Sequence, residues 1–250
     1  MALRQLRRTW EALGRDDPLW AILTHEGKRG GRWQLDPFFR TGREEVDAVL
    51  ATAASHAPEL RRARALDFGC GVGRLTQALA RHFAAVDGVD IAASMVAQAS
   101  ELDRGPHGSG GRCTFHAHTR ADLSLFGDAV FDFVYSSLTL QHMPPRLALA
   151  YLDELCRVLR PGGLLVFDLP ERPKRSRSHL GRWASRVLRT ASLVWHRHLL
   201  GRARMDMFGI APARIAARVA RAGCRVVWQE PIGSGGPDWW AHRYGVARIE

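Results

Sequence analysis

Apolar and polar positions along this chain follow two different periods, and the changes between them outline the predicted elements. From residue 64 onward, short apolar runs are separated by stretches in which apolar residues recur at helical spacing. Strands that alternate with helices predict an α/β fold, a mostly parallel sheet with helices on both faces. We expect strands at 64–69, 85–89, 113–118, 131–136 and 163–168, and helices near 73–82, 92–103 and 145–160.

The residues before the first strand predict a helical cap. Within residues 1–60, apolar side chains recur at helical spacing, and Asp17 with Pro18 resembles a helix cap followed by a first helical position. We therefore divide the chain into a cap at 1–60 and a sheet-bearing domain at 61–250. The cap is an extension of that domain and has no sheet of its own.

The pattern changes again after the fifth predicted strand. We expect a helix near 212–222, followed by strands near 224–230 and 242–249. The loop from Gly233 to Pro237 separates these two strands, so they should form a hairpin.

An arginine-rich stretch at 172–204 interrupts the alternation, and we expect a helical insertion at 170–205. The stretch holds ten Arg or Lys residues and no acid, while Leu180, Trp183 and Val187 recur at helical spacing. One face is then apolar and the other cationic. Such a helix is typical of a surface helix packed on the domain, of a lid over a substrate site, or of a contact with a membrane surface or nucleic acid.

Composition adds a nucleic-acid hypothesis without deciding it. The net charge is +11, and clustered cations attract phosphates. Lysine is nearly absent (Lys28 and Lys174) while arginine and alanine abound, a bias that a GC-rich genome produces without selection for binding. The first thirty residues lack the apolar core of a signal peptide, and no apolar run approaches the roughly 20 residues of a membrane span. We expect a cytoplasmic protein.

The four cysteines predict no disulfide and no metal site. They are far apart and form no Cys-x-x-Cys pattern, at Cys70, Cys113, Cys156 and Cys224. We expect them to be reduced thiols.

The glycine loop after the first predicted strand points to an adenosine ligand. It reads Asp67-Phe68-Gly69-Cys70-Gly71-Val72-Gly73-Arg74. Glycine lets a backbone turn with positive φ or approach a ligand closely, and the helix start that follows offers unpaired N–H groups. A dinucleotide fingerprint would place its third glycine at position 74, where this chain has arginine. Asp90 follows about 20 residues later, where a carboxylate accepts both ribose hydroxyls.

Three further motifs follow the glycine loop along the chain. They are Val89–Met95, Phe131–Ser136 and Arg157–Leu165. With the loop, in this order and at this spacing, they resemble the class I S-adenosylmethionine-dependent methyltransferases. The resemblance implies a doubly wound, mostly parallel sheet of seven strands with a reversed last strand, and S-adenosyl-L-methionine as the cofactor.

The resemblance also implies a set of cofactor-binding residues. They are Asp67, Gly69, Cys70, Gly71, Asp90, Ile91, Met95, Arg120, Ala121, Ser136 and Leu138. The first four would hold the methionine end of the cofactor and form the turn beneath it. Asp90 would bind the ribose, and Ile91 and Met95 would border the adenine. Arg120 and Ala121 would add backbone contacts to the adenine, while Ser136 and Leu138 would approach the methionyl amino group. A loop-capping role for Asp67 and core filling by Met95 are the alternatives.

His142 is the candidate catalytic residue. The sulfonium already makes its methyl group electrophilic, so the protein mainly has to position the acceptor and exclude water. A hydroxyl acceptor also needs a base within hydrogen-bond reach, and His142 lies in the loop after the fourth strand. The alternative is a histidine that holds the Pro144-Pro145 turn.

The acceptor is less well defined by the sequence. Enzymes that methylate nucleobase amines resemble one another in an Asn/Asp-Pro-Pro-Tyr/Phe motif, where this chain has Ser136-Ser137-Leu138-Thr139. Trp239 and Trp240 on the last loop, and Trp33, are candidates for an acceptor pocket or for core packing. We expect a small-molecule acceptor, methylated at oxygen on a sugar or secondary metabolite. Nucleic-acid methylation through the arginine-rich stretch, or a non-catalytic cofactor-binding scaffold, are the alternatives.

Overall fold

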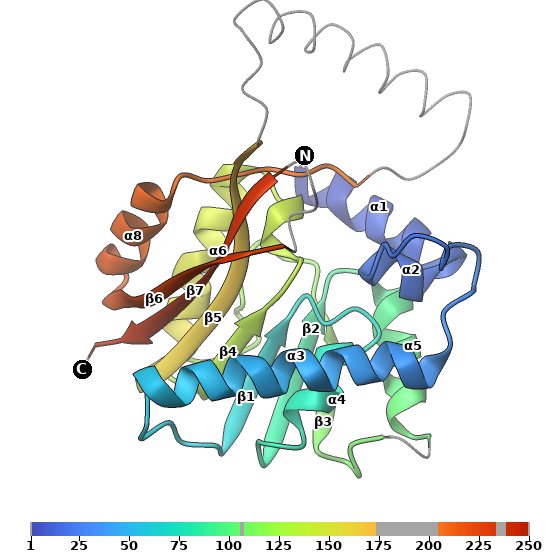
Figure 1. Ribbon diagram of the computed structural model, residues 1–250, viewed down its shortest axis with the longest axis horizontal. Helices are drawn as coiled ribbons and strands as arrows, with labels where there is room; N and C mark the ends of the chain where they lie inside the picture. The colour runs from blue at the N-terminus through green and yellow to red at the C-terminus, as the bar shows by residue number, and fades with distance from the viewer. Residues whose placement is uncertain (1, 106–107, 174–204, 234–238, 250) are drawn as a thin grey trace, which may run out of the picture.

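Seven strands form one sheet in the part of the chain that the structure describes. The structure is a computed structural model that describes residues 2–105, 108–173, 205–233 and 239–249. The strands are β1 (Arg64–Phe68), β2 (Ala85–Asp90), β3 (Cys113–Ala117), β4 (Phe131–Ser136), β5 (Leu159–Pro173), β6 (Cys224–Ile232) and β7 (Trp239–Arg248). They lie in the order β3-β2-β1-β4-β5-β7-β6 (Figure 1).

Helices precede, connect and flank these strands. The N-terminal ones are α1 (Ala2–Asp16), α2 (Pro18–Ile22) and α3 (Leu35–His56). The others are α4 (Arg74–Leu79), α5 (Ala93–Asp103), the short 3₁₀ helix η1 (Leu140–His142), α6 (Pro145–Val158) and α8 (Pro212–Arg221). Residues 1–60 are thus helical where they have regular structure, as their apolar spacing predicts.

The direction of the strands matches the predicted fold. β1 pairs in parallel with β2 and β4, β2 with β3, and β4 with β5. β7 runs antiparallel between β5 and β6, so the last strand is reversed and lies inside the sheet. The expectation of a mostly parallel, seven-stranded sheet with a reversed last strand is therefore confirmed.

Successive residues of the central strands face opposite layers of helices, because side chains alternate along a strand. On one face, Ala65 of β1 and Phe133 of β4 pack with apolar residues of α3 and α4. On the other face, Leu66 and Val134 pack with apolar residues of α6 and α8. Both layers of the core are thus built around β1, β4 and β5, and Figure 1 shows helices on both sides of these strands.

The start of β5 differs from the prediction. Pro161, Gly162 and Gly163 were expected to separate a helix from a strand that begins at 163, but they lie inside β5. Leu159 pairs with Phe131 and Leu164 with Phe133, so the residues between them form an irregularity in the ladder. Gly162 has a φ of +71°, a conformation that glycine adopts without strain and that lets the strand bulge and continue.

The far end of β5 and the start of β7 also differ from the prediction. Trp239 and Trp240 were placed on a loop, but they begin β7 and pair with Pro173 and Arg172 of β5. The strand β5 reaches Pro173, so it enters the range expected for the helical insertion. Most of the expected helical insertion falls on residues 174–204, which lie outside the described part of the chain.

Candidate active site

A cavity of about 790 Å³ opens at the carboxyl ends of β1, β2 and β4. Ligands of open α/β sheets bind at this edge, where the loops after the strands converge. Three groups of residues line it: the glycine loop, the residues that end β2, and the loop from β4 into η1. Of the residues predicted from the sequence, the cavity brings together Gly69, Gly71, Asp90, Ile91, Met95, Leu138 and His142, with Trp33 of the acceptor-pocket candidates.

The glycine loop bends under the cavity with a backbone that only glycine accepts easily. Gly69, Gly71 and Gly73 have φ values of +85°, +52° and +84°. A Cβ on Gly69 would overlap the side chain of Thr139, and a Cβ on Gly71 would press against Ile22. The loop is therefore packed against α2 above it and the β4 loop beside it.

Asp90 lies at the end of β2 with its carboxylate held by the backbone. Its two oxygens accept hydrogen bonds from the N–H groups of Gly71 (2.9 Å) and Ala92 (2.8 Å). Each carboxylate oxygen can accept a second bond, so the group can still receive two donors from the cavity. Burial in the cavity wall raises the pKa of Asp90, and the bonds from Ala92 and Gly71 act against that rise.

Asp67 lies behind the glycine loop. Its Oδ2 accepts a hydrogen bond from the Thr76 hydroxyl at 2.7 Å, while its Oδ1 is buried without a partner. Burial raises the pKa of Asp67 to about 7, which makes this carboxyl unusually easy to protonate.

Four other predicted residues also lie off the cavity wall, in the part of the chain that the structure describes. Cys70 is buried within the loop, and Ser136 donates a hydrogen bond to the Phe68 carbonyl. Arg120 and Ala121 are exposed, and His118 lines the cavity in their place. The strand β3 ends at Ala117, which brings His118 to the edge of the sheet. The roles of these four, and of Asp67, stay predictions.

The loop after β4 has a strained backbone. Leu138 has a φ of +57°, which is unfavourable for a residue with a branched side chain. Such outliers persist where the surroundings fix them, commonly at ligand sites. Beside it, the Ser137 hydroxyl donates a hydrogen bond to Asp168 at 3.1 Å, and Thr139 donates to the Ser137 carbonyl.

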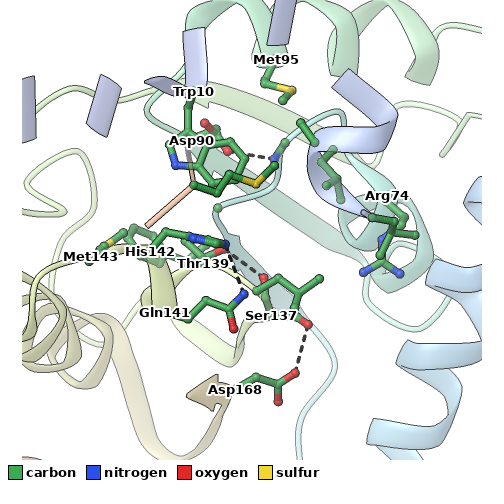
Figure 2. Close-up of a pocket in the computed structure, with 18 of the residues that line it drawn as sticks. Trp10, Arg74, Asp90, Met95, Ser137, Thr139, Gln141, His142, Met143 and Asp168 are labelled. Atoms are coloured by element: carbon green, nitrogen blue, oxygen red, sulfur yellow. Dashed lines mark hydrogen bonds between the residues drawn. The ribbon is translucent and has the colours of Figure 1, made fainter. Parts of the chain in front are cut away.

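His142 is held as a neutral imidazole. Its Nδ1 lies 2.8 Å from the carbonyl oxygen of Asp206, and because a carbonyl only accepts, Nδ1 carries the proton. Its Nε2 lies 3.2 Å from the side-chain nitrogen of Gln141 and therefore accepts. Burial lowers the pKa of His142, and the Asp206 carbonyl acts against that change. Figure 2 shows Trp10, Asp90 and His142 around the same space.

The surroundings of His142 bear on its two sequence-based hypotheses. Trp10 contacts the ring edge-on, with centroids 5.2 Å apart. Within the described residues, neither ring nitrogen bonds to the Pro144-Pro145 turn. Nδ1 bonds to the carbonyl of Asp206, and Nε2 bonds to the side chain of Gln141. The geometry is that of a base whose Nε2 lone pair accepts from the amide of Gln141, so an acceptor hydroxyl has to displace that amide to reach it.

A buried network of charges forms another part of the wall, and the sequence did not predict it. Glu45 of α3 accepts from Arg74 (2.8 Å) and from the hydroxyl of Tyr135 (2.7 Å). Arg243 of β7 donates twice to Asp168 of β5, at 2.8 and 3.0 Å. Burial raises the pKa of Asp168; for Glu45, burial acts in the same direction, but Arg74 and the hydroxyl donors outweigh it and lower the pKa. The one signal of this network in the sequence is the position of Arg74, a charged residue directly after the glycine loop.

The helix α1 forms a further part of the cavity wall. Leu3, Leu6 and Trp10 share one face of α1 and line the cavity. The carboxylate of Glu11 accepts hydrogen bonds from the N–H groups of Ala93 (2.6 Å) and Ser94 (3.4 Å) at the start of α5. The cap is thus attached to the element that follows Asp90.

In the described residues, no group of three or more His, Cys, Asp or Glu side chains is placed to hold a metal ion. No helix among those same residues is long and apolar enough to span a membrane.

Comparison with known proteins supports a methyltransferase domain in this chain. A family model described as a methyltransferase domain matches residues 65–163. The trans-aconitate 2-methyltransferase of Streptomyces avermitilis is 34% identical over 156 residues, which cover 56% of this chain and 55% of that protein. Residues 65–163 of this chain therefore match a methyltransferase domain. The resemblance inferred from the four motifs is confirmed. The chain spans about half the length of the curated relatives it matches.

Solved structures agree with this methyltransferase domain in fold. The magnesium protoporphyrin IX methyltransferase of Synechocystis PCC 6803, with bound SAH, has a TM-score of 0.66 at 20% identity, covering 99% of this chain and 100% of that one. The cyclase SpnF has a TM-score of 0.66 at 16% identity, covering 100% of this chain and 97% of that one. One fold thus carries different reactions, and the reaction must be argued from the site.

Proposed function

We propose that this chain transfers a methyl group from S-adenosylmethionine to a hydroxyl oxygen of a small molecule. The observation that carries the proposal is one cavity in which Asp90 at the end of β2 lies with a neutral His142 after β4. The first residue suits a ribose, and the second suits removal of a hydroxyl proton. The match to a methyltransferase domain supports the choice of cofactor.

The described residues fit this cofactor. Asp90 keeps lone pairs for the two ribose hydroxyls, and Ile91 and Met95 offer apolar surface beside it for the adenine. The glycines at 69 and 71 leave backbone without side chains below the methionine end, and the buried Oδ1 of Asp67 is an acceptor that lacks a donor. When bound, S-adenosylmethionine supplies an electrophilic methyl group on a sulfonium.

The residues of the chain then position the acceptor and move one proton. The Asp206 carbonyl fixes the His142 ring with its Nε2 lone pair toward the cavity. The acceptor hydroxyl would give its proton to Nε2 while its oxygen takes the methyl group; the bond between the methyl carbon and the sulfonium sulfur would break and leave S-adenosylhomocysteine. Leu3, Leu6 and Trp10 of α1 give the cavity an apolar wall, which disfavours water that would otherwise compete as an acceptor.

A sugar or a secondary metabolite is the acceptor that we propose, in a cytoplasmic enzyme. The N-terminal cap forms part of the cavity wall, which suits an enclosed small molecule. The nucleic-acid alternative depends on the arginine-rich stretch, most of which lies outside the described residues, and nothing in the site favours it.

Isothermal titration with S-adenosylhomocysteine tests the cofactor assignment. We expect Asp90→Ala to weaken binding by about 10- to 100-fold, because each hydrogen bond to a charged group contributes roughly 1.5–3 kcal/mol. The matched control is Asp16→Ala, an exposed carboxylate at the end of α1, which should leave the affinity unchanged. Equal affinities for wild type and Asp90→Ala would refute the assignment.

A further inference from the structure

We infer that Gln141 and His142 together form a hydroxyl-binding pair. Of the two acceptor classes proposed above, this pair favours an apolar secondary metabolite that presents a hydroxyl group over a sugar, and it rejects carboxylates. The inference rests on the proposed methyl transfer and deepens it. It differs from what the name of the trans-aconitate relative suggests, since aconitate is a carboxylate.

The first argument is the one-sided chemistry of His142. Its Nδ1–H donates to the Asp206 carbonyl, so the polar group that the His142 ring can present to a ligand is the lone pair on Nε2. A lone pair binds a group that carries a proton, such as a hydroxyl. It repels a carboxylate, which has no proton to donate at neutral pH.

The second argument is the state of Gln141. The residue is only 5% exposed, and it lines the cavity. Its amide nitrogen lies on Nε2 of His142, while its Oε1 is buried without a hydrogen-bond partner. Buried polar atoms without partners are rare in folded proteins, so the residues around Gln141 satisfy its side chain only in part.

Gln141 and His142 are positioned so that one hydroxyl can form a hydrogen bond with each of them. The backbone carbonyl of Gln141 accepts from Phe208, and the N–H of His142 donates to Thr139, so the short helix η1 is fixed on two sides. A hydroxyl that takes the place of the Gln141 amide on Nε2 donates to His142. Because a hydroxyl also accepts, it can receive an N–H of Gln141 at the same time.

The surrounding wall suits an apolar body. Trp10 contacts His142, and the same cavity is also lined by the apolar side chains of Leu3, Leu6, Met205, Met207 and Ile232. Among the described residues of the wall, the guanidinium groups are those of Arg74 and Arg243, and they pair with the carboxylates of Glu45 and Asp168 respectively. The charges of these four side chains cancel, so they give no net attraction for an anion.

A matched pair of probes tests the inference. 2-Naphthol and 2-naphthoate share the same apolar body and differ in the group presented to His142. We expect the protein loaded with S-adenosylhomocysteine to bind naphthol at least about tenfold more tightly than naphthoate at pH 7.5, measured by titration calorimetry. Gln141→Leu should weaken naphthol binding about 5- to 10-fold and leave the affinity for S-adenosylhomocysteine unchanged.

Controls and contrary outcomes separate the possible causes. Gln229→Leu changes an exposed glutamine of β6 and should alter none of these affinities. If Gln141→Leu does not fold, as judged by thermal unfolding, Gln141→Ala replaces it. Equal or tighter binding of naphthoate, no binding of naphthol, or loss of S-adenosylhomocysteine affinity in the Gln141 variant would each overturn the inference. Failure of the wild type to bind S-adenosylhomocysteine would overturn the proposed function, and the inference with it.

The nitrogen shifts of His142 give a readout that needs no acceptor turnover. In ¹⁵N-labelled protein, Nε2 should have the shift of an unprotonated nitrogen, and naphthol should change it. A protonated Nε2 at neutral pH would contradict the pair.

Discussion

At Asp67, one buried carboxyl group lowers the stability of the fold while it is expected to contribute to cofactor binding. One of its oxygens is bonded to Thr76 and the other has no partner in a fully buried position. Its pKa rises to about 7 because burial disfavours the charged form. The folded state thus keeps this proton at pH values where the unfolded state has lost it.

We therefore predict that Asp67→Asn stabilises the protein, and more so at pH 8 than at pH 5. For an acid whose pKa is raised in the folded state, stability falls as the pH rises from the unfolded pKa, near 4, to the folded pKa, near 7. An amide does not titrate and escapes this loss, so the melting temperature at pH 8 should rise by a few degrees.

The contribution of Asp67 to cofactor binding is measured on the same variant. If Asp67 holds the methionine end of the cofactor, Asp67→Asn should weaken S-adenosylhomocysteine binding while it raises the melting temperature. A lower melting temperature at pH 8 would show that the ionised carboxylate stabilises the fold.

At His142 we predict a loss of rate without a loss of cofactor affinity. His142→Ala should reduce kcat by about 10²- to 10⁴-fold, the usual contribution of a general base. The affinity for S-adenosylhomocysteine, measured by calorimetry, should stay within about threefold of wild type. Near-normal turnover would leave His142 a structural role at Asp206 and Trp10.

The pH dependence of the same reaction follows from the direction of the pKa shift. Burial lowers the pKa of His142 below its ordinary value of about 6.5, and the base must be neutral to act. The rate should therefore rise with pH through an apparent pKa below 6.5 and be flat above pH 7. A rate that keeps rising above pH 7 would indicate that another group limits it.

Single residues of this site were predictable where local chemistry fixes them. The glycines, Asp90 and His142 follow strands or begin helices, so their place at the sheet edge could be predicted from spacing alone. Arg120 and Ala121 were predicted by counting from a strand end, and they lie off the cavity wall while His118 lines it. A loop position carries no periodicity that would fix which side chain turns inward.

At the scale of elements, the contact between α1 and α5 joins the cap to the sheet-bearing domain. The residue before α5 is Ala92, which has no side chain able to cap the helix. Glu11 of α1 supplies that cap from 82 residues away by accepting from the N–H group of Ala93. The start of α5 and the position of α1 therefore depend on each other.

We predict that Glu11→Ala lowers the melting temperature by about 2–6 °C. Loss of a helix cap typically costs about 0.5–2 kcal/mol, and Ala93 would lose its acceptor. Glu44→Ala is the control, because Glu44 is exposed and its nearest cation, Arg40, is 3.8 Å away, so little stability should be lost. Faster hydrogen exchange at Ala93 in Glu11→Ala would locate the effect, and unchanged melting would contradict it.

The elements themselves were predictable to the extent that their boundaries follow from local residues. The strands β1 to β4 were expected within about two residues, because each is a short apolar run bounded by turn residues. The start of β5 was not, because a Pro-Gly-Gly sequence stops a strand in most settings and here forms a bulge within one. Whether the ladder resumes after a bulge depends on the neighbouring strand.

At the scale of the whole molecule, the parallel strands explain why one cavity contains residues from so many parts of the chain. Parallel strands bring the loops after them to the same edge, so Gly69, Asp90 and Leu138 meet although they are far apart in sequence. The ion pairs from Glu45 to Arg74 and from Arg243 to Asp168 join α3, α4, β5 and β7. Such pairs depend on how distant elements pack, which no local pattern in the sequence encodes.

The position of β7 inside the sheet has a consequence for how the protein is made. In the described sheet, β6 is an edge strand whose neighbour is β7, and β7 follows it in the chain. As the chain leaves the ribosome, β6 emerges first and has no partner until β7 has been synthesised and inserted beside β5. This half of the sheet therefore completes after translation of β7, and until then the exposed edges of β5 and β6 are open to pairing with other chains.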